Sequence, residues 1–190
     1  MIGHFERAPG GYRASLDGDH SLLFQQLLRE ILLVLDDPGV SSPVLAAIDE
    51  ETDRPAPHDP ALGHLLPSMS LEPQEAERMR ALTEDFLRAE KSSRLRRVRQ
   101  EMSRARLAAR PVWVDEDDVW DWLAALNDVR LALSGELGLE DQSDAERVER
   151  LAMEQEESRA RENNVAAVYM MVTWWQGSLL GAMRAGVPTN

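Results

Sequence analysis

The sequence predicts a mainly α fold, a multi-helix single domain over residues 1–190 with a small N-terminal β-hairpin. Apolar residues recur at helical spacing through the greater part of the chain. Proline and glycine separate these runs, as at Pro38-Gly39, Pro73, Pro111 and Gly138. A chain of 190 residues also has the length of one domain with a sizeable buried core.

Residues 119–139 are expected to form the central helix. Apolar side chains cover most of its circumference, which is typical of a helix surrounded by others. Only a narrow edge is expected to face water: Asp121, Ala125, Asp128, Ala132 and Glu136. Asp115 is expected to cap the start of this helix and Gly138 to end it.

The N-terminal part predicts a hairpin followed by shorter helices. Residues 2–16 hold two extended segments around Pro9-Gly10-Gly11, and residues 112–114 are expected to add a third strand. Residues 20–37 predict a core helix. Shorter helices are expected at residues 43–50 and 60–66, where proline occupies the first turn.

Residues 73–110 carry the longest helical pattern, with a break expected near Ser92-Ser93. Its core-facing residues are expected to form two apolar stripes. The first comprises Met79, Leu82, Phe86 and Ala89, and the second comprises Leu95, Val98, Met102, Ala105 and Ala109.

The C-terminal part predicts two more helices. Ser143 and Glu146 form a capping box for a charged helix that is expected to reach Arg161. Residues 164–185 follow, and they lack charge from Val165 to Met183. Because Thr173, Gln176 and Ser178 interrupt this run, it predicts a packing helix rather than a membrane span, with Gly177 and Gly181 permitting close approach to the central helix.

Charge is segregated along the chain. The formal net charge is −13, yet residues 88–110 hold nine cations and two acids, which is +7 and leaves −20 elsewhere. Arg96, Arg99, Arg106 and Arg110 flank one side of the second apolar stripe, and Arg94, Arg97 and Arg104 flank the other. These arginines either pair with acids of the same chain or dock an acidic partner protein. Net charge and the lack of interleaved aromatic residues disfavour direct nucleic-acid binding. The candidate partner-binding residues are Arg94, Arg96, Arg97 and Arg99.

The residue types disfavour enzymatic chemistry. Without cysteine the chain has no disulfide, thiolate metal site or cysteine nucleophile. His58-Asp59 with His64 is the closest approach to a metal site, and residues 115–118 are acidic, but loop and capping roles account for both. No phosphate-binding loop, nucleophile elbow or apolar carboxylate pair occurs, so we expect no catalytic residue and no cofactor. The N-terminus lacks a signal-peptide pattern, and the cytoplasm is the expected compartment.

Three polar residues interrupt apolar helix faces: Asn127, Arg130 and Gln176. Buried polar groups need partners, so a structural polar core that fixes helix register is the favoured interpretation. The alternative is a small-molecule pocket that also includes Trp120, and it requires an enclosed cavity.

Several segments resemble the AosR family, actinomycete oxidative-stress regulators that were formerly a domain of unknown function. The matching segments are His58–Pro67, Phe86–Leu95, Trp122–Leu139 with its Leu126-Asn-Asp-Val-Arg-Leu131 centre, and the close from Tyr169 through Trp174-Trp175-Gln176 to Leu180. The resemblance implies a non-enzymatic regulator that binds an extracytoplasmic-function sigma factor. It also implies that the protein promotes transcription of sulfur and cysteine biosynthesis genes under oxidative stress. Genes of this family tend to lie beside the gene of a Clp adaptor.

One departure from that family affects the controlling signal. The redox-responsive family member is thought to sense oxidant through an N-terminal cysteine pair, and residues 1–10 contain no cysteine here. Disulfide switching therefore does not carry over. The expected function is a cytoplasmic regulatory protein that binds a protein partner such as a sigma factor. The alternative is a helical adaptor or assembly protein, a homodimer or Clp-linked, with no transcriptional role.

Overall fold

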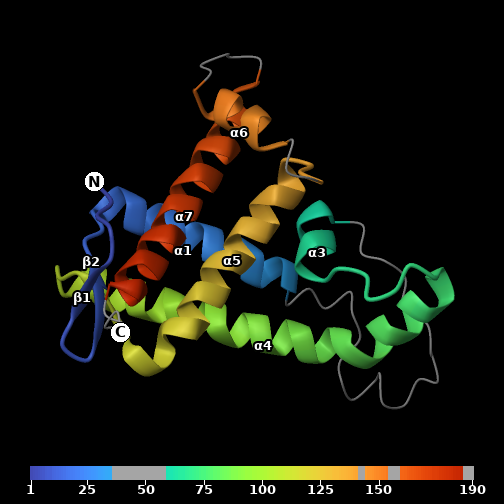
Figure 1. Ribbon diagram of the computed structural model, residues 1–190, viewed down its shortest axis with the longest axis horizontal. Coiled ribbons are helices and arrows are strands. Elements are labelled where there is room, and N and C mark those ends of the chain that lie inside the picture. Colours follow the sequence, from blue (N-terminus) through green and yellow to red (C-terminus); the bar gives the residue numbers. More distant parts are fainter. Residues whose placement is uncertain (36–58, 141–143, 154–158, 186–190) are drawn as a thin grey trace.

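The computed structural model describes residues 1–35, 59–140, 144–153 and 159–185. This part of the chain contains six α-helices and one three-stranded antiparallel sheet, which confirms the predicted fold class (Figure 1). The helices are α1 (Gly18–Leu35), α3 (Pro60–Leu65), α4 (Pro73–Leu107), α5 (Val119–Glu136), α6 (Asp144–Met153) and α7 (Ala160–Arg184). A short 3-10 turn, η1 (Glu116–Asp118), precedes α5.

The sheet joins the N-terminus to the middle of the chain. β1 (Glu6–Ala8) and β2 (Gly11–Ala14) form the predicted hairpin, and Gly10 turns it with φ +85°. β3 (Val112–Asp115) pairs antiparallel with β2, with Tyr12 opposite Val114. The predicted third strand is thus confirmed, and it places the start of α5 beside the hairpin.

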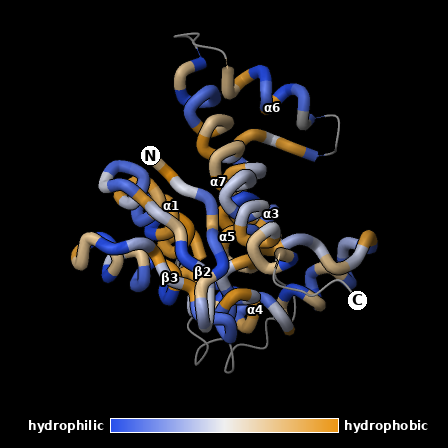
Figure 2. The backbone as a smooth tube through the Cα atoms, turned by 60° about the vertical axis from the view of Figure 1, so that its left-hand side comes forward, coloured by the Kyte–Doolittle hydropathy of each residue, from blue (hydrophilic) through white to orange (hydrophobic). Residues whose placement is uncertain are grey.

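The helix α5 is central, as predicted, and contacts α1, α3, α4, α7 and β3. At its N-terminal end the core is aromatic: the ring of Trp175 lies 4.8 Å from the rings of Phe5 and Phe24 and 6.4 Å from Trp122. Figure 2 shows long apolar stretches in this interior and a largely hydrophilic α4 along its edge.

The predicted water-facing edge of α5 is wrong in its middle. Ala125, Asp128 and Ala132 are buried, whereas Trp120 is 69% exposed. The reason is tertiary: α4 covers Asp128 and supplies Lys91 to neutralise it, which no periodicity in α5 could indicate.

The two ends of α5 differ in their capping. At the C-terminus Gly138 adopts φ +60°, and the amides of Gly138 and Leu139 donate to the carbonyls of Gly135 and Ser134 at 3.0 Å. This Schellman arrangement confirms the predicted stop. The predicted Asp115 cap is wrong, because its carboxylate accepts from Trp113 Nε1 at 2.8 Å and η1 intervenes before the helix.

The helix α4 runs unbroken past Ser92, so the expected break is absent from its 35 residues. Ser92 is 1% exposed and so lies on the buried face of the helix. Of the two predicted stripes, the second is buried from Leu95 to Ala105, with Ala109 exposed after the helix ends. The first stripe is not buried and is treated below.

The C-terminal helices also differ from expectation. The charged helix ends at Met153 rather than Arg161, and α7 begins at Ala160. Gly177 and Gly181 are exposed, with nothing within 4 Å of where a Cβ would lie, so they do not mediate the packing of α7 on α5. None of the described helices is long and apolar enough to cross a membrane. Ser143 and the helix expected at residues 43–50 lie outside the described residues.

Candidate partner-binding groove

A groove of ≈ 210 Å³ lies where the C-terminal half of α4 faces β3, η1 and the first turn of α5. α4 contributes arginines, the opposite wall contributes Asp115, Asp118 and Asp121, and two tryptophans contribute apolar surface. The lining residues are Arg94, Arg97, Val98, Gln100, Glu101, Arg104, Trp113, Asp115, Asp118, Asp121 and Trp122.

Helical spacing explains why one side of α4 supplies the groove. Arg94, Arg97, Glu101 and Arg104 are separated by three, four and three residues, which places them on one face. The neighbouring face, with Leu95, Val98 and Met102, is buried in the core and fixes the rotation of the helix. Sequence spacing had already assigned Arg94, Arg97 and Arg104 to one side of the apolar stripe.

Part of this charge is neutralised within the chain. Arg97 Nη2 lies 2.7 Å from Asp121 Oδ2, and its Nη1 lies 3.9 Å from Asp118 Oδ1. All three side chains are well exposed to water, so the pairs are weak, on the order of 0–1 kcal/mol each. A partner's charges can therefore replace them at low cost.

Glu101 is more firmly held. Its carboxylate accepts hydrogen bonds from Arg110 Nη1 at 2.7 Å and Nη2 at 3.1 Å, and from the Trp113 amide at 3.1 Å. The hydrogen bond that Arg110 donates to Glu101 raises the pKa of the Arg110 guanidinium, which stays charged at every physiological pH. This cluster ties the C-terminal end of α4 to β3 and makes one wall of the groove rigid.

Arg94 and Arg104 are the arginines of the groove that take no part in the ion pairs found among the described residues. Arg94 Nε is buried and has no hydrogen-bond acceptor in the described part of the chain. Arg104 is exposed, and the ion pairs found among the described residues do not include it. The exposed guanidinium of Arg104 can thus donate hydrogen bonds to carboxylate or carbonyl oxygens of a ligand.

The four arginines singled out from the sequence do not form one face. Arg94 and Arg97 line the groove, whereas Arg96 and Arg99 are exposed on α4 outside it. Arg104 and Trp113 belong to the groove and were not among the candidates. The three-four-three spacing from Arg94 was the signal for Arg104; only the pairing of β3 with β2 places Trp113 there.

The polar residues of α5 and α7 occupy a separate, packed site. Arg130 donates to Gln176 Oε1 at 2.9 Å and Thr173 Oγ1 at 3.1 Å, and lies 5.6 Å from the centre of the Tyr169 ring. Gln176 in turn donates to the Leu123 carbonyl at 3.0 Å. Arg130 and Gln176 therefore join α5 to α7, and the half-buried Asn127 is not part of this network.

The small-molecule pocket considered from the sequence would have needed Trp120 beside these residues, and the Trp120 side chain is largely in solvent. A cavity of ≈ 310 Å³ between α1, α3, α5 and α7 is lined by none of the four residues. His64 contacts Ser134 Oγ at 2.9 Å, and His58 lies outside the described residues. Within the described ranges no three His, Asp or Glu side chains are grouped to hold a metal ion.

A groove of guanidinium, carboxylate and indole groups has the chemistry of a protein-binding surface. Arginine and tryptophan are the side chains most enriched among the dominant contacts of protein interfaces. Exposed ion pairs provide charge complementarity and steer association.

Comparison with known proteins gives a family and no function. A family model described as a domain of unknown function, DUF2017, matches residues 1–183. This description does not name the AosR family. No curated protein and no solved structure matches the chain. Because this family model matches the chain almost from end to end, the chain belongs to the DUF2017 family.

Proposed function

We propose that this protein is a non-enzymatic regulator that binds a protein partner, an extracytoplasmic-function sigma factor, through the groove between α4 and α5. The partner class comes from the AosR resemblance of the sequence. The observation that carries the proposal is the groove itself, where Arg94 and Arg104 lie near Trp113 and take no part in the ion pairs found among the described residues.

The weakness of the internal ion pairs supports this proposal. Arg97 can leave Asp121 for an incoming carboxylate, and the released Asp121 can meet a basic side chain of the partner. An interface of this kind gives specificity and a fast association rate that falls as salt rises.

The test compares two variants with the same loss of charge. R94Q/R104Q removes the two groove arginines, and R96Q/R99Q removes two exposed arginines of α4 that do not line the groove. Each is mixed with the purified sigma factor of the host, and affinity is measured by calorimetry at low and physiological salt. We expect the groove variant to bind at least about tenfold more weakly, a loss of about 1.4 kcal/mol, and the matched variant to bind as the wild type.

Two results would contradict the proposal. If the wild type fails to bind any sigma factor of the host, the transcriptional role is wrong. If both variants lose affinity equally, net charge rather than the groove governs binding. An adaptor role is the second candidate, and it is favoured by Leu82 and Phe86, which are exposed on α4. The partner would then be a Clp component.

A further inference from the structure

The N-terminal half of α4 has its polar residues inside and its apolar residues outside. Glu84 and Arg88 are 3% and 7% exposed, whereas Leu82 and Phe86 are 80% and 68% exposed and Met79 is 40% exposed. We call Met79, Leu82 and Phe86 the outer stripe. Sequence periodicity had assigned this stripe to the core, and that prediction is wrong.

The buried polar face explains the inversion. Arg88 Nε donates to Glu84 Oε1 at 2.8 Å, and Arg88 Nη1 donates to the carbonyls of Val34 and Leu35 at 3.3 and 2.8 Å. These carbonyls belong to the last turn of α1, where intrahelical partners are lacking and a cation is favoured.

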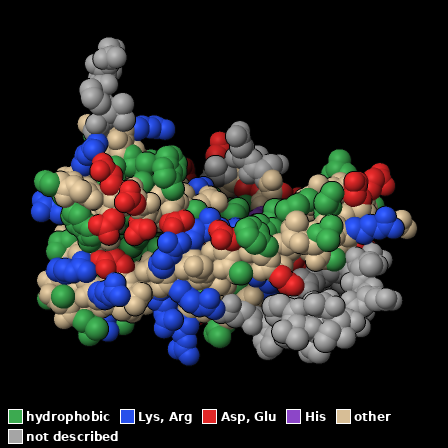
Figure 3. Space-filling view, turned by 90° about the horizontal axis from the view of Figure 1, so that it is seen from below, with side chains coloured by type: hydrophobic (Ala, Val, Ile, Leu, Met, Phe, Trp, Pro, Cys, Tyr) green, Lys and Arg blue, Asp and Glu red, His purple; other side chains and the backbone are tan. Residues whose placement is uncertain are grey.

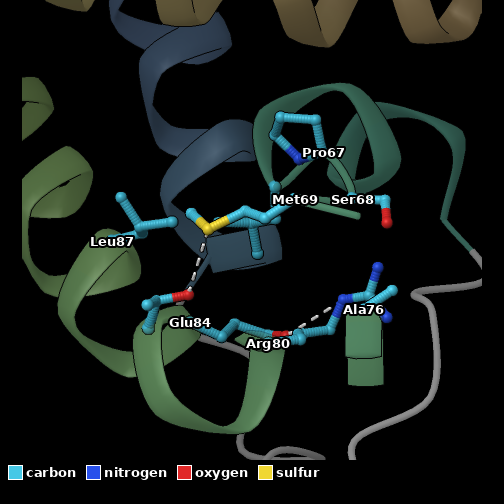
Figure 4. Close-up of a pocket in the computed structure, with 9 residues that line it drawn as sticks. Pro67, Ser68, Met69, Ala76, Arg80, Glu84 and Leu87 are labelled. Carbon is cyan, nitrogen blue, oxygen red and sulfur yellow. Dashed lines mark hydrogen bonds and ion pairs between the residues drawn. The ribbon is translucent and has the colours of Figure 1, made fainter. Parts of the chain in front are cut away.

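Arg80 extends the same buried face. Its Nε lies 3.8 Å from Glu84 Oε2, and Figure 4 shows both side chains beneath Pro67 and Met69. The cavity there is only ≈ 10 Å³, so the face is closely packed. Rotating α4 to bury its outer stripe would leave charges of this network buried without counter-charges, which costs about 3–5 kcal/mol for a broken buried pair. The outer stripe is therefore held outward by the fold.

The outer stripe has the spacing of a helix-docking seam. Met79, Leu82 and Phe86 are three and four residues apart, and exposed Ala89 continues the alternation. This is the a/d repeat by which one helix packs along another.

Beyond Ala89 the same side of α4 carries exposed Glu90 and then Arg97 and Arg104, which also line the groove. Arg97 follows Phe86 by eleven residues and Arg104 follows it by eighteen. Because eighteen residues make five full turns of an α-helix, Arg104 points in the same direction from the helix axis as Phe86. Arg97 begins the basic part about 16 Å along the axis from Phe86. Figure 3, which looks at the side of the molecule formed by α4, shows Lys and Arg side chains gathered there.

We infer that the outer side of α4 docks an acidic amphipathic α-helix of a protein partner. Its apolar residues would cover Met79, Leu82 and Phe86, and its acidic residues would lie along Arg97 and Arg104. This inference rests on the proposed function in that both require a protein partner, and it specifies which segment of the partner is bound.

A second copy of the chain fits this surface less well. In a parallel pairing, Arg97 and Arg104 of one α4 would face the same arginines of the other, which is repulsive. In an antiparallel pairing over the whole surface, Leu82 and Phe86 would lie against the arginines of the other copy. Only an apolar segment continued by acidic residues complements both parts at once.

The first experiment measures whether the outer stripe is accessible. Because the chain has no cysteine, L82C provides a unique thiol. We expect maleimide to label L82C in the monomeric protein about as fast as S93C, a control at an exposed polar position of α4. Labelling at least tenfold slower than the control would show that the chain itself covers the stripe, and would overturn the inference.

The second experiment uses synthetic helices of four heptads as probes. One peptide has leucine at the a and d positions of two heptads and glutamate on the same face of the other two, made with the acidic block at either end. The control peptide has lysine in place of glutamate. We expect one acidic peptide to bind the full-length protein at least tenfold more tightly than the lysine peptide, as measured by fluorescence anisotropy.

Variants locate the binding. L82D/F86D should weaken binding of the acidic peptide at least tenfold, and L33D, which changes an exposed leucine of α1, should leave it unchanged. Binding that is absent, or insensitive to L82D/F86D, would overturn the inference. Sedimentation that shows a wild-type dimer and an L82D/F86D monomer would also overturn it, in favour of a second copy.

The two proposals fail in different ways. If L82D/F86D binds the sigma factor as well as the wild type does, groove binding stands and the docked helix is wrong. If the acidic peptide binds the outer stripe and no sigma factor binds the protein, the docked helix stands and the partner named above is wrong.

Discussion

Gly135 lies where α3 crosses α5, and the two backbones meet there. A Cβ built on Gly135 would lie 2.3 Å from the carbonyl oxygen of Pro60 and 2.9 Å from the Cα of Ala61. Both clashing atoms are main chain, so no side chain can move aside to make room. This single residue therefore sets how closely α3 packs on the central helix.

We expect G135A to destabilise the protein by about 1–3 kcal/mol, because the overpacking outweighs the better helix propensity of alanine. The matched control is G177A in α7, where nothing lies within 4 Å of a Cβ. It should stabilise the protein by about 0.5–1 kcal/mol, since only propensity changes. Urea denaturation measures both free energies of unfolding, and a G135A midpoint at or above that of the wild type would contradict the interpretation.

The ion pair Lys91–Asp128 joins α4 to α5. Its side chains are 13% and 4% exposed, and Lys91 Nζ donates to Asp128 Oδ1. K91M leaves a buried carboxylate without its cation, and we expect a loss of about 3–5 kcal/mol. K91M/D128L should regain most of this loss because it leaves no buried charge, so a double variant as unstable as K91M alone would show that the pair is not the cause.

At the scale of elements, we expect the stability of the protein to be more sensitive to substitutions on the buried face of α4 than to substitutions on its exposed face. Leu82 and Phe86 contribute little to folding because they are exposed, whereas Glu84 is buried beside Arg88. We expect L82Q/F86Q to change the free energy of unfolding by about 0.5 kcal/mol or less. E84L should cost about 3–5 kcal/mol, because Arg88 stays buried without its carboxylate. Thermal unfolding followed by circular dichroism compares them, and the reverse order would mean that the outer stripe is covered in the folded chain.

The helix pair α5 and α7 is joined by a polar clamp at Arg130. We expect R130M to destabilise the protein by about 1–3 kcal/mol, since the hydrogen bonds to Gln176 and Thr173 and the contact with the Tyr169 ring are lost together. N127L, at the neighbouring half-buried position outside the clamp, is the control and should change stability by no more than about 1 kcal/mol. If urea denaturation showed that R130M and N127L lower the free energy of unfolding equally, the hydrogen bonds of Arg130 would have no particular role in joining α5 to α7.

At the scale of the whole molecule, one core runs from the N-terminal sheet through α1, α4, α5 and α7. A second, smaller cluster holds α6 on α7 through Leu137, Val148, Leu151 and Ala166. Because Ala166 belongs to α7, the small cluster is not independent of the large one. We expect a single cooperative unfolding transition, with tryptophan fluorescence and far-ultraviolet circular dichroism coinciding in urea. A fluorescence transition displaced from the helical one would show that α6 and the aromatic core unfold separately.

How much of the fold the sequence predicts is clear from particular elements. The hairpin, the third strand, the end of α5 at Gly138 and the centrality of α5 all follow from local chemistry: positive φ at glycine, β-branched residues before a turn, and apolar residues around a helix. The two flanks of arginines on α4 also follow from helical spacing alone, which is why Arg94, Arg97 and Arg104 meet in one groove. The buried face does not follow for the N-terminal half of α4 or for the middle of α5.

What the sequence by itself determined is therefore the set of elements, the segregation of charge and the family resemblance. Only the tertiary structure decided which faces are inside. Periodicity reports which residues share a face, but the free energy of burial depends on what the neighbouring element offers. Arg88 is buried because α1 presents bare carbonyls to it, Asp128 because α4 presents Lys91, and Leu82 and Phe86 are exposed as the consequence.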